Sequence, residues 1–112
     1  MIRVYDNVNK VNKMCFSAPA TPYCRLGQNY YRAKVEVEIE LAKHIVDFCD
    51  LETYFKADLN GADLTVEELC NEVFETLRNA YKPHSIKVTV NSDSHFPIAV
   101  TKDSNEETIS IE

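Results

Sequence analysis

The stretch YRAKVEVEIEL, residues 31–41, alternates apolar and charged side chains with a period of two. Its apolar positions are rich in β-branched residues, and three glutamates, one lysine and one arginine lie between them. This pattern predicts a half-buried β-strand with one face in water. Such a strand needs an antiparallel neighbour, and residues 2–17 are the only candidate upstream.

Two helices are predicted downstream of this strand. Residues 47–57 carry apolar side chains at helical spacing, and Asn60-Gly61 then breaks the chain. Thr65-Val66-Glu67-Glu68 is typical of a capping box, in which Thr65 and Glu68 each bond the other's backbone N–H. Apolar residues then repeat at intervals of three and four until Pro83, which predicts an amphipathic helix lying on a sheet.

A β-hairpin is predicted after the second helix. Residues 85–91 and 96–100 alternate again, with turn residues between them. The order ββααββ indicates an α+β fold, an antiparallel four-stranded sheet with both helices on one face. We expect one domain over residues 1–103, with residues 104–112 as a C-terminal tail or a short edge strand. Because the sheet has two unpaired edges, we expect copies to join into an oligomeric barrel.

The composition narrows the range of partners. The 112 residues carry a formal net charge of -6, which argues against DNA binding, because a DNA-binding surface is basic. There is no apolar run long enough to span a membrane and no signal-peptide pattern, so we expect a cytoplasmic protein. The four cysteines form no CxxC pair and are expected to be free thiols, with Cys49 and Cys70 packed on their helices.

Short motifs resemble the tunnelling-fold (T-fold) superfamily, and within it the 6-pyruvoyl- and 6-carboxy-tetrahydropterin synthases. The motifs keep the family's order along the chain. They are Phe16-Ser17-Ala18, residues 27–30 (GQNY), residues 45–51 (IVDFCDL), Asp58-Leu59-Asn60 and residues 65–69 (TVEEL). The resemblance implies lyase- or synthase-like chemistry on a pterin bound between the subunits of a homo-oligomer.

The metal ligands of that family are missing from this chain. The resemblance implies a zinc ion held by three histidines, but those positions fall on Ala20, Leu26 and Gln28. None of these side chains is a good zinc ligand, so we expect no zinc and no other cofactor. The family's pterin-anchoring glutamate falls near Asn91, which we take as a candidate substrate-binding residue.

A second T-fold branch offers a different chemistry. The nitrile reductases of queuosine synthesis, and the small archaeal enzymes that form archaeosine in tRNA, attack 7-cyano-7-deazaguanine with a cysteine. Cys24 and Glu67 are similar in pattern to the nucleophile and the base-holding glutamate of that branch. The acidic residue that the branch has seven places after the cysteine is Tyr31 here, and the nicotinamide-binding segment is absent. The resemblance therefore implies amidinotransferase-like chemistry through Cys24 without hydride transfer, and tRNA is a partner only under this alternative.

Each candidate residue also has a plain structural explanation. Cys24 is either a nucleophile, with Arg25 favouring its thiolate, or a packed thiol without a role. Glu67 either holds a guanine-like edge or simply suits the helix dipole, whereas Glu68 is explained by the capping box. Three functions follow as alternatives: a T-fold protein that binds a pterin or 7-deazaguanine-type heterocycle between subunits, a cysteine-dependent enzyme acting on 7-cyano-7-deazaguanine, and an inactive oligomeric binding module.

Overall fold

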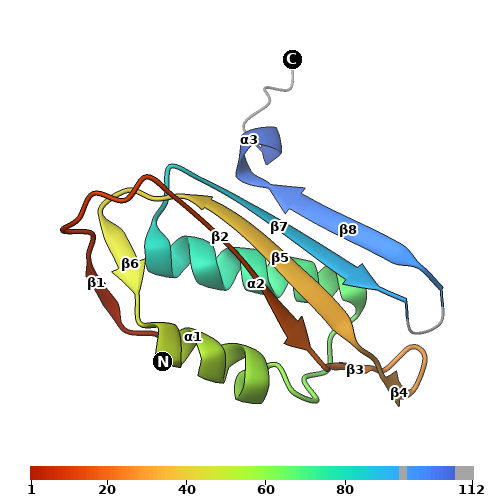
Figure 1. Ribbon diagram of the computed structural model, residues 1–112. Coiled ribbons are helices and arrows are strands. Elements are labelled where there is room, and N and C mark those ends of the chain that lie inside the picture. Colours follow the sequence, from red (N-terminus) through yellow and green to blue (C-terminus); the bar gives the residue numbers. More distant parts are fainter. Residues whose placement is uncertain (94–95, 108–112) are drawn as a thin grey trace.

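A four-stranded antiparallel sheet with the order β2-β5-β7-β8 forms the framework of the computed structural model, which describes residues 1–93 and 96–107 (Figure 1). The strands are β2 (Lys13–Ala20), β5 (Ala33–Glu40), β7 (Ser85–Ser92) and β8 (Ile98–Asp103). The predicted α+β class and the antiparallel sheet are therefore confirmed. The partner of the central strand begins only at Lys13, because residues 1–12 form a separate arm.

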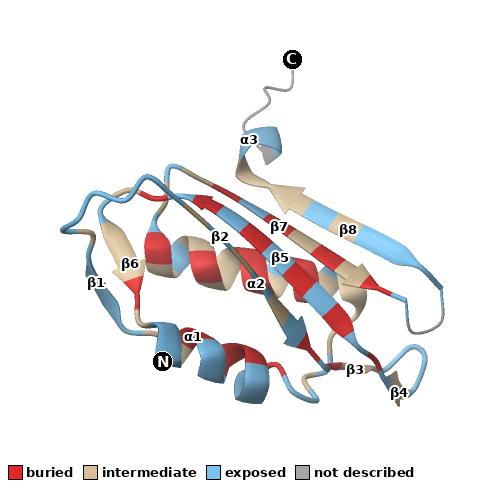
Figure 2. Ribbon diagram, viewed as in Figure 1, coloured by how far each residue is buried: buried red, intermediate tan, exposed pale blue. Residues whose placement is uncertain are grey.

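Strand β5 has the alternation expected from its sequence. Val35, Val37 and Ile39 are 0%, 1% and 0% exposed, whereas the glutamates between them face solvent. The register places these apolar residues opposite Val90, Val88 and Ile86 of β7. Figure 2 shows the buried residues of both strands alternating with exposed residues on β5 and mostly with intermediate ones on β7. One face of the sheet is therefore core, and the other is the predicted solvated face.

The helices cover the core face of the sheet. Helix α1 (Phe48–Thr53) continues as a π-helical turn, η1 (Tyr54–Asp58), which lies against β2. The longer α2 (Val66–Tyr81) packs against β7 and β8. Figure 1 shows both helices on the same side of the sheet, as predicted. The wider π turn buries Tyr54 and Phe55 side by side.

Both helices begin with a side-chain cap, and the one at Thr65 is the predicted capping box. The carboxylate of Asp47 accepts from the backbone N–H groups of Cys49 and Asp50, at 2.8 and 3.1 Å. Thr65 and Glu68 form both halves of the capping box. At its other end, α2 closes on Lys82, whose backbone is left-handed (φ 45°) and whose N–H donates to the carbonyl of Arg78.

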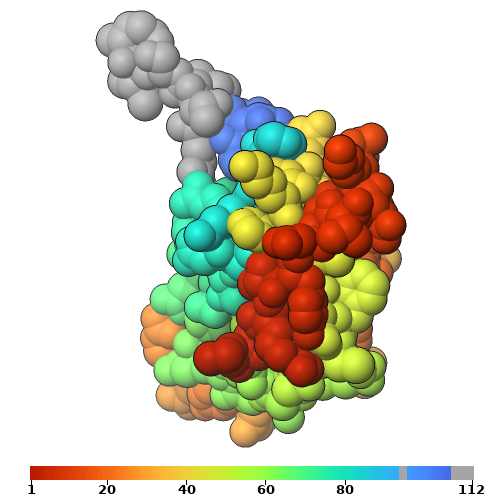
Figure 3. Space-filling view, turned by 90° about the vertical axis from the view of Figure 1, so that its left-hand side faces the viewer, coloured from red at the N-terminus to blue at the C-terminus, as the bar shows by residue number. Residues whose placement is uncertain are grey.

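The N-terminal arm is fastened beside α1. Strand β1 (Val4–Asp6) pairs with β6 (His44–Val46), and Figure 3 shows this segment lying against α1. The guanidinium of Arg3 pairs with Asp50 at 2.8 Å. The Asp50 carboxylate thus binds Arg3, whereas Asp47 caps α1.

The sheet ends on β2 at one edge and on β8 at the other. After β8 the chain forms a helical turn, α3 (Ser104–Glu107), where we expected a tail or an edge strand. Residues 108–112 lie outside the described part of the chain. Within the described part, no helix has the length and apolar character needed to cross a bilayer. The oligomeric barrel stays a prediction.

The cap of α2 can be tested by replacing Thr65 with alanine. The change removes the hydroxyl that accepts the N–H of Glu68 at 3.3 Å, and we expect it to lower the free energy of unfolding by about 1 kcal/mol. Urea denaturation measures the difference. Thr53→Ala is the control, because the Thr53 hydroxyl only donates to the Cys49 carbonyl inside the helix. Equal unfolding midpoints for the two variants would contradict the assignment of the cap.

Candidate functional site

A small hairpin between β2 and β5 carries Cys24. Its strands are β3 (Tyr23–Cys24) and β4 (Asn29–Tyr30), with Cys24 opposite Asn29. The rings of Tyr23 and Tyr30 meet edge to face, with centroids 5.2 Å apart. Because each strand has only two residues, the hairpin needs support from another part of the chain.

The loop before α2 supplies that support. The N–H of Tyr23 donates to the carbonyl of Ala62 at 2.8 Å, and the N–H of Leu64 donates to the carbonyl of Tyr23 at 2.9 Å. These bonds pair the Cys24 hairpin with the segment that leads directly into α2. Cys24 is thereby held beside the first turn of α2, which carries Glu67.

Arg25 adds a side-chain link between the same two segments. Its guanidinium donates to both carboxylate oxygens of Glu68, at 3.0 and 2.9 Å, and to Asp63 at 3.3 Å. Hydrogen bonds from Arg25, and then from the backbone of Thr65, lower the pKa of Glu68 to about 2. We expected the charge of Arg25 to favour the Cys24 thiolate. In the structure the guanidinium pairs with two carboxylates, those of Asp63 and Glu68.

Tyr31 occupies the centre of this arrangement. It is 6% exposed, and its hydroxyl donates to the carbonyl of Leu64 at 2.7 Å. Burial raises the pKa of Tyr31, and the negative charges of Cys24, Glu67 and Glu68 raise it further. Tyr31 therefore lies close enough to both predicted site residues, Cys24 and Glu67, to interact with them electrostatically. The tyrosine therefore stays protonated and acts as a neutral donor where the resemblance implied an acidic residue.

Glu67 faces solvent in the first turn of α2, and no hydrogen-bond or ion-pair partner for it is found among the described residues. It lines a surface hollow of about 390 Å³. The other lining residues are Asp63, Leu64, Glu68, Asn71 and Glu72. Since Arg25 and the capping box engage Glu68, Glu67 is the carboxylate left to receive a ligand's N–H groups.

Asn91 is not part of this site within one chain. Its side chain lies on the solvated face of the sheet, where its amide donates to Glu36 at 2.8 Å. It lines a different hollow, together with Arg32 and Ala99. Because α2 covers the opposite face, the sheet separates Asn91 from Glu67.

The positions of the resembled family's metal ligands do not fit zinc. Ala20 is buried at the end of β2, and Leu26 and Gln28 lie in the exposed turn of the hairpin. None of the three offers the imidazole or thiolate that zinc requires. Within residues 1–93 and 96–107, no group of three or more histidine, cysteine, aspartate or glutamate side chains is arranged to hold a metal ion.

The remaining cysteines divide into two kinds. Cys70 is buried under the sheet as expected, with its thiol 3.5 Å from the carbonyl of Val88, and burial raises its pKa. Cys49, predicted to pack on its helix, is exposed, because the core-facing side of α1 and η1 runs through Leu51 and Phe55 instead. Cys15 is exposed on β2, and Cys24 is half-buried.

Comparisons with known proteins bear on the fold alone. No known family model matches the sequence, and no curated protein matches it either. Among solved structures, the crystal structure of the archaeosine synthase QueF-like in its apo form matches with a TM-score of 0.78. The match covers 84% of this chain and 94% of the other, at 18% sequence identity. The chain therefore shares the overall fold of that structure. The likeness supports the T-fold resemblance without selecting a branch of the superfamily.

The link from Arg25 to Glu68 is testable through its pH dependence. Since the pKa of folded Glu68 lies near 2, below its ordinary value of 4.5, the link stabilises the fold above pH 4.5 and is lost as the pH falls toward 2. We expect the melting temperature of the wild type to drop across this range, and that of Arg25→Gln to drop less.

Thermal melts between pH 6 and 2.5 measure this difference. Arg78→Gln is the matched control, because Arg78 pairs with Glu75 inside a single helix. We expect it to keep more of the wild-type pH dependence. Parallel curves for the wild type and Arg25→Gln would count against the link.

Proposed function

We propose that this chain binds a 7-deazaguanine-type heterocycle against Glu67 and forms a covalent bond to it through Cys24. The observation that carries the proposal is the pairing of Tyr23 with residues 62 and 64, which holds Cys24 beside the start of α2. Two residues 43 positions apart in sequence (24 and 67) thereby share one site around Tyr31. The QueF-like fold of an archaeosine synthase adds support at the level of architecture.

Glu67 has the chemistry to select the heterocycle. A carboxylate can accept two parallel N–H bonds, and a guanine-like ring offers a ring N–H beside an exocyclic amino group. Glu68 does not compete for the ligand, because its carboxylate oxygens already accept hydrogen bonds from Arg25 and from the backbone N–H of Thr65. The free carboxylate of Glu67 is thus the natural anchor.

Cys24 supplies the covalent step when the heterocycle carries a nitrile. The sulfur bonds to the nitrile carbon, one carbon–nitrogen π bond breaks, and the thiol proton moves to the nitrogen, which gives a thioimide. Attack by ammonia on the thioimide carbon then expels the Cys24 thiol and leaves an amidine. Neither step needs an oxidant or a reductant. Tyr31, held protonated, is a neutral neighbour for the developing N–H group.

A second copy of the chain would complete this site. Asn91 lies on the solvated face, away from Glu67 of its own chain, so it can join the ligand only across a boundary between copies. The unpaired edges of β2 and β8 are the natural places for such a boundary. We therefore place the proposed site between the subunits of a homo-oligomer.

Tyr31 also supports a second candidate function, that of a binding module without turnover. The archaeosine-type pattern has an acidic residue at this position, and a carboxylate there can accept and return protons. The Tyr31 hydroxyl is instead committed to the carbonyl of Leu64. Under this alternative, Glu67 holds the heterocycle, a pterin included, and Cys24 stays unmodified.

Incubation with 7-cyano-7-deazaguanine separates the two functions. We expect the intact mass to increase by that of one whole ligand, because addition expels no group. Cys24→Ala should abolish the increase, whereas Cys49→Ala, which removes an exposed thiol elsewhere, should leave it unchanged. A mass increase that survives Cys24→Ala would contradict the covalent proposal.

Melting temperatures report binding independently of the adduct. A ligand that binds the native state raises the melting temperature, and we expect Glu67→Gln to remove most of that shift, since the amide NH₂ meets a ligand N–H. A shift without a mass change favours the binding module. If neither 7-cyano-7-deazaguanine nor any pterin produces a shift, the proposed site is wrong.

A further inference from the structure

One side-chain amide in the hollow beside Glu67 has a fixed orientation. Asn71 follows Glu67 by four residues on α2, so the two side chains lie on the same face of the helix, and both line the hollow of about 390 Å³. The ammonium of Lys102 donates to the amide oxygen Oδ1 of Asn71 at 2.6 Å. An ammonium only donates hydrogen bonds, so the amide cannot turn its NH₂ group toward Lys102. Among the described residues that NH₂ group has no partner, and it is left to donate to a ligand.

The ammonium that orients the amide is itself held in place. It lies 4.8 Å from the centroid of the Phe74 ring and 3.5 Å from the carboxylate of Glu75. Phe74 is 0% exposed, so the ring is part of the core rather than a mobile surface group. Lys102 belongs to β8, and α2 packs against that strand. The packing of the helix on the sheet thus determines the direction in which Asn71 donates.

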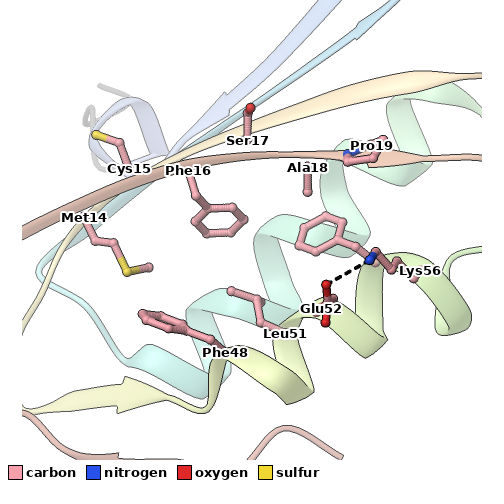
Figure 4. A pocket seen from close by; sticks show the side chains of 11 residues that line it. Met14, Cys15, Phe16, Ser17, Ala18, Pro19, Phe48, Leu51, Glu52 and Lys56 are labelled. Carbon is pink, nitrogen blue, oxygen red and sulfur yellow. Dashed lines mark hydrogen bonds and ion pairs between the residues drawn. The ribbon is translucent and has the colours of Figure 1, made fainter.

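The apolar groove between β2 and α1 offers no comparable set of polar groups (Figure 4). Its volume is about 430 Å³, and the side chains that meet across it are apolar except for Glu52 and Lys56. These two pair with each other at 2.8 Å, so the carboxylate of Glu52 already accepts a charged donor. The described residues that line the groove include no asparagine or glutamine. A polar heterocycle therefore finds its partners at Glu67 and Asn71, and not in this groove.

The position of Cys24 determines which part of the heterocycle meets Asn71. The Cys24 hairpin is bonded to residues 62 and 64, which precede α2, whereas Asn71 lies one helical turn beyond Glu67. Cys24 and Asn71 are thus on opposite sides of Glu67 along the axis of α2. In 7-cyano-7-deazaguanine, the ring N–H (N1) and the amino group that Glu67 would accept have the carbonyl and the nitrile on one side and the ring nitrogen N3 on the other. With the nitrile turned toward Cys24, N3 faces Asn71.

We propose that Asn71 donates a hydrogen bond from its amide NH₂ to N3 of the heterocycle and is a specificity-determining residue of the site. The inference rests on the proposed function and adds a second contact to it. Glu67 accepts from the ring N–H and the amino group, and Asn71 donates to the ring nitrogen on the other side of that amino group. Guanine-type rings and pterins share this order of donors and acceptor, and adenine-type rings lack it. Lys102 is a positioning residue, because it acts on the ligand only through Asn71.

Calorimetric titration of the full-length Cys24→Ala chain tests the proposal, because binding stays reversible without the thiol. The two ligands are 7-cyano-7-deazaguanine and its 3-deaza counterpart, in which a C–H group replaces N3. We expect the 3-deaza ligand to bind roughly threefold to tenfold more weakly, as for the loss of one hydrogen bond. Asn71→Asp, added to the same chain, should reverse this preference, because a carboxylate repels the lone pair of N3 but tolerates the C–H group.

Asn79→Asp is the matched control, because Asn79 is exposed on the same helix, does not line the hollow and receives the same charge. Its ratio of the two affinities should equal that of the Cys24→Ala chain. Lys102→Met leaves the amide free to turn and should bring the ratio toward one, although Asn71 is still present; an unchanged ratio would overturn the orienting role of the ammonium. Equal affinities in the Cys24→Ala chain, or a ratio that Asn71→Asp does not change, would overturn the proposal and leave the proposed function standing. If neither ligand binds, both are wrong.

Discussion

The side chains of Val35, Val37 and Ile39 enter the core from the centre of the sheet, between β2 and β7, and the rest of the architecture depends on their burial. Because the residues between them are charged, only one face of β5 can be covered. Both helices must therefore lie on that face, and the loops that return to the sheet must leave from its ends. The hairpin that carries Cys24 and the loop that leads into α2 meet at one of these ends.

Local signals along the chain predicted much of this fold. The alternation of β5 and the capping box at Thr65 each depend on near neighbours in sequence, so they could be recognised without tertiary information. The first strand of the sheet was predicted within residues 2–17, whereas β2 begins at Lys13. The prediction was imprecise because the apolar residues of the N-terminal arm follow no clear period. The π turn after Thr53 was missed as well. It follows from how Tyr54 and Phe55 pack against the sheet, and the sequence of a single helix does not contain that information.

The sequence named individual residues of the candidate site, but it did not predict how they contact one another. Resemblance selected Cys24 and Glu67, and the structure brings both within electrostatic range of Tyr31. The pairing of Arg25 with Glu68 was not foreseen, because it joins residues 43 positions apart and has no local pattern. A basic residue beside the cysteine and a second carboxylate beside Glu67 were visible signals. Only their geometry shows that they neutralise each other. The place of Asn91 likewise depends on which face of β7 it occupies.

The end of α2 carries backbone strain. Lys82 adopts a left-handed backbone, a conformation that glycine accepts without penalty and that costs a residue with a Cβ atom about 1 kcal/mol. Pro83 follows directly, and a residue before proline is also disfavoured in compact backbone conformations. The turn that connects α2 to β7 is thus slightly strained. Replacing Lys82 with glycine would remove this strain and raise the free energy of unfolding, at a position far from Cys24.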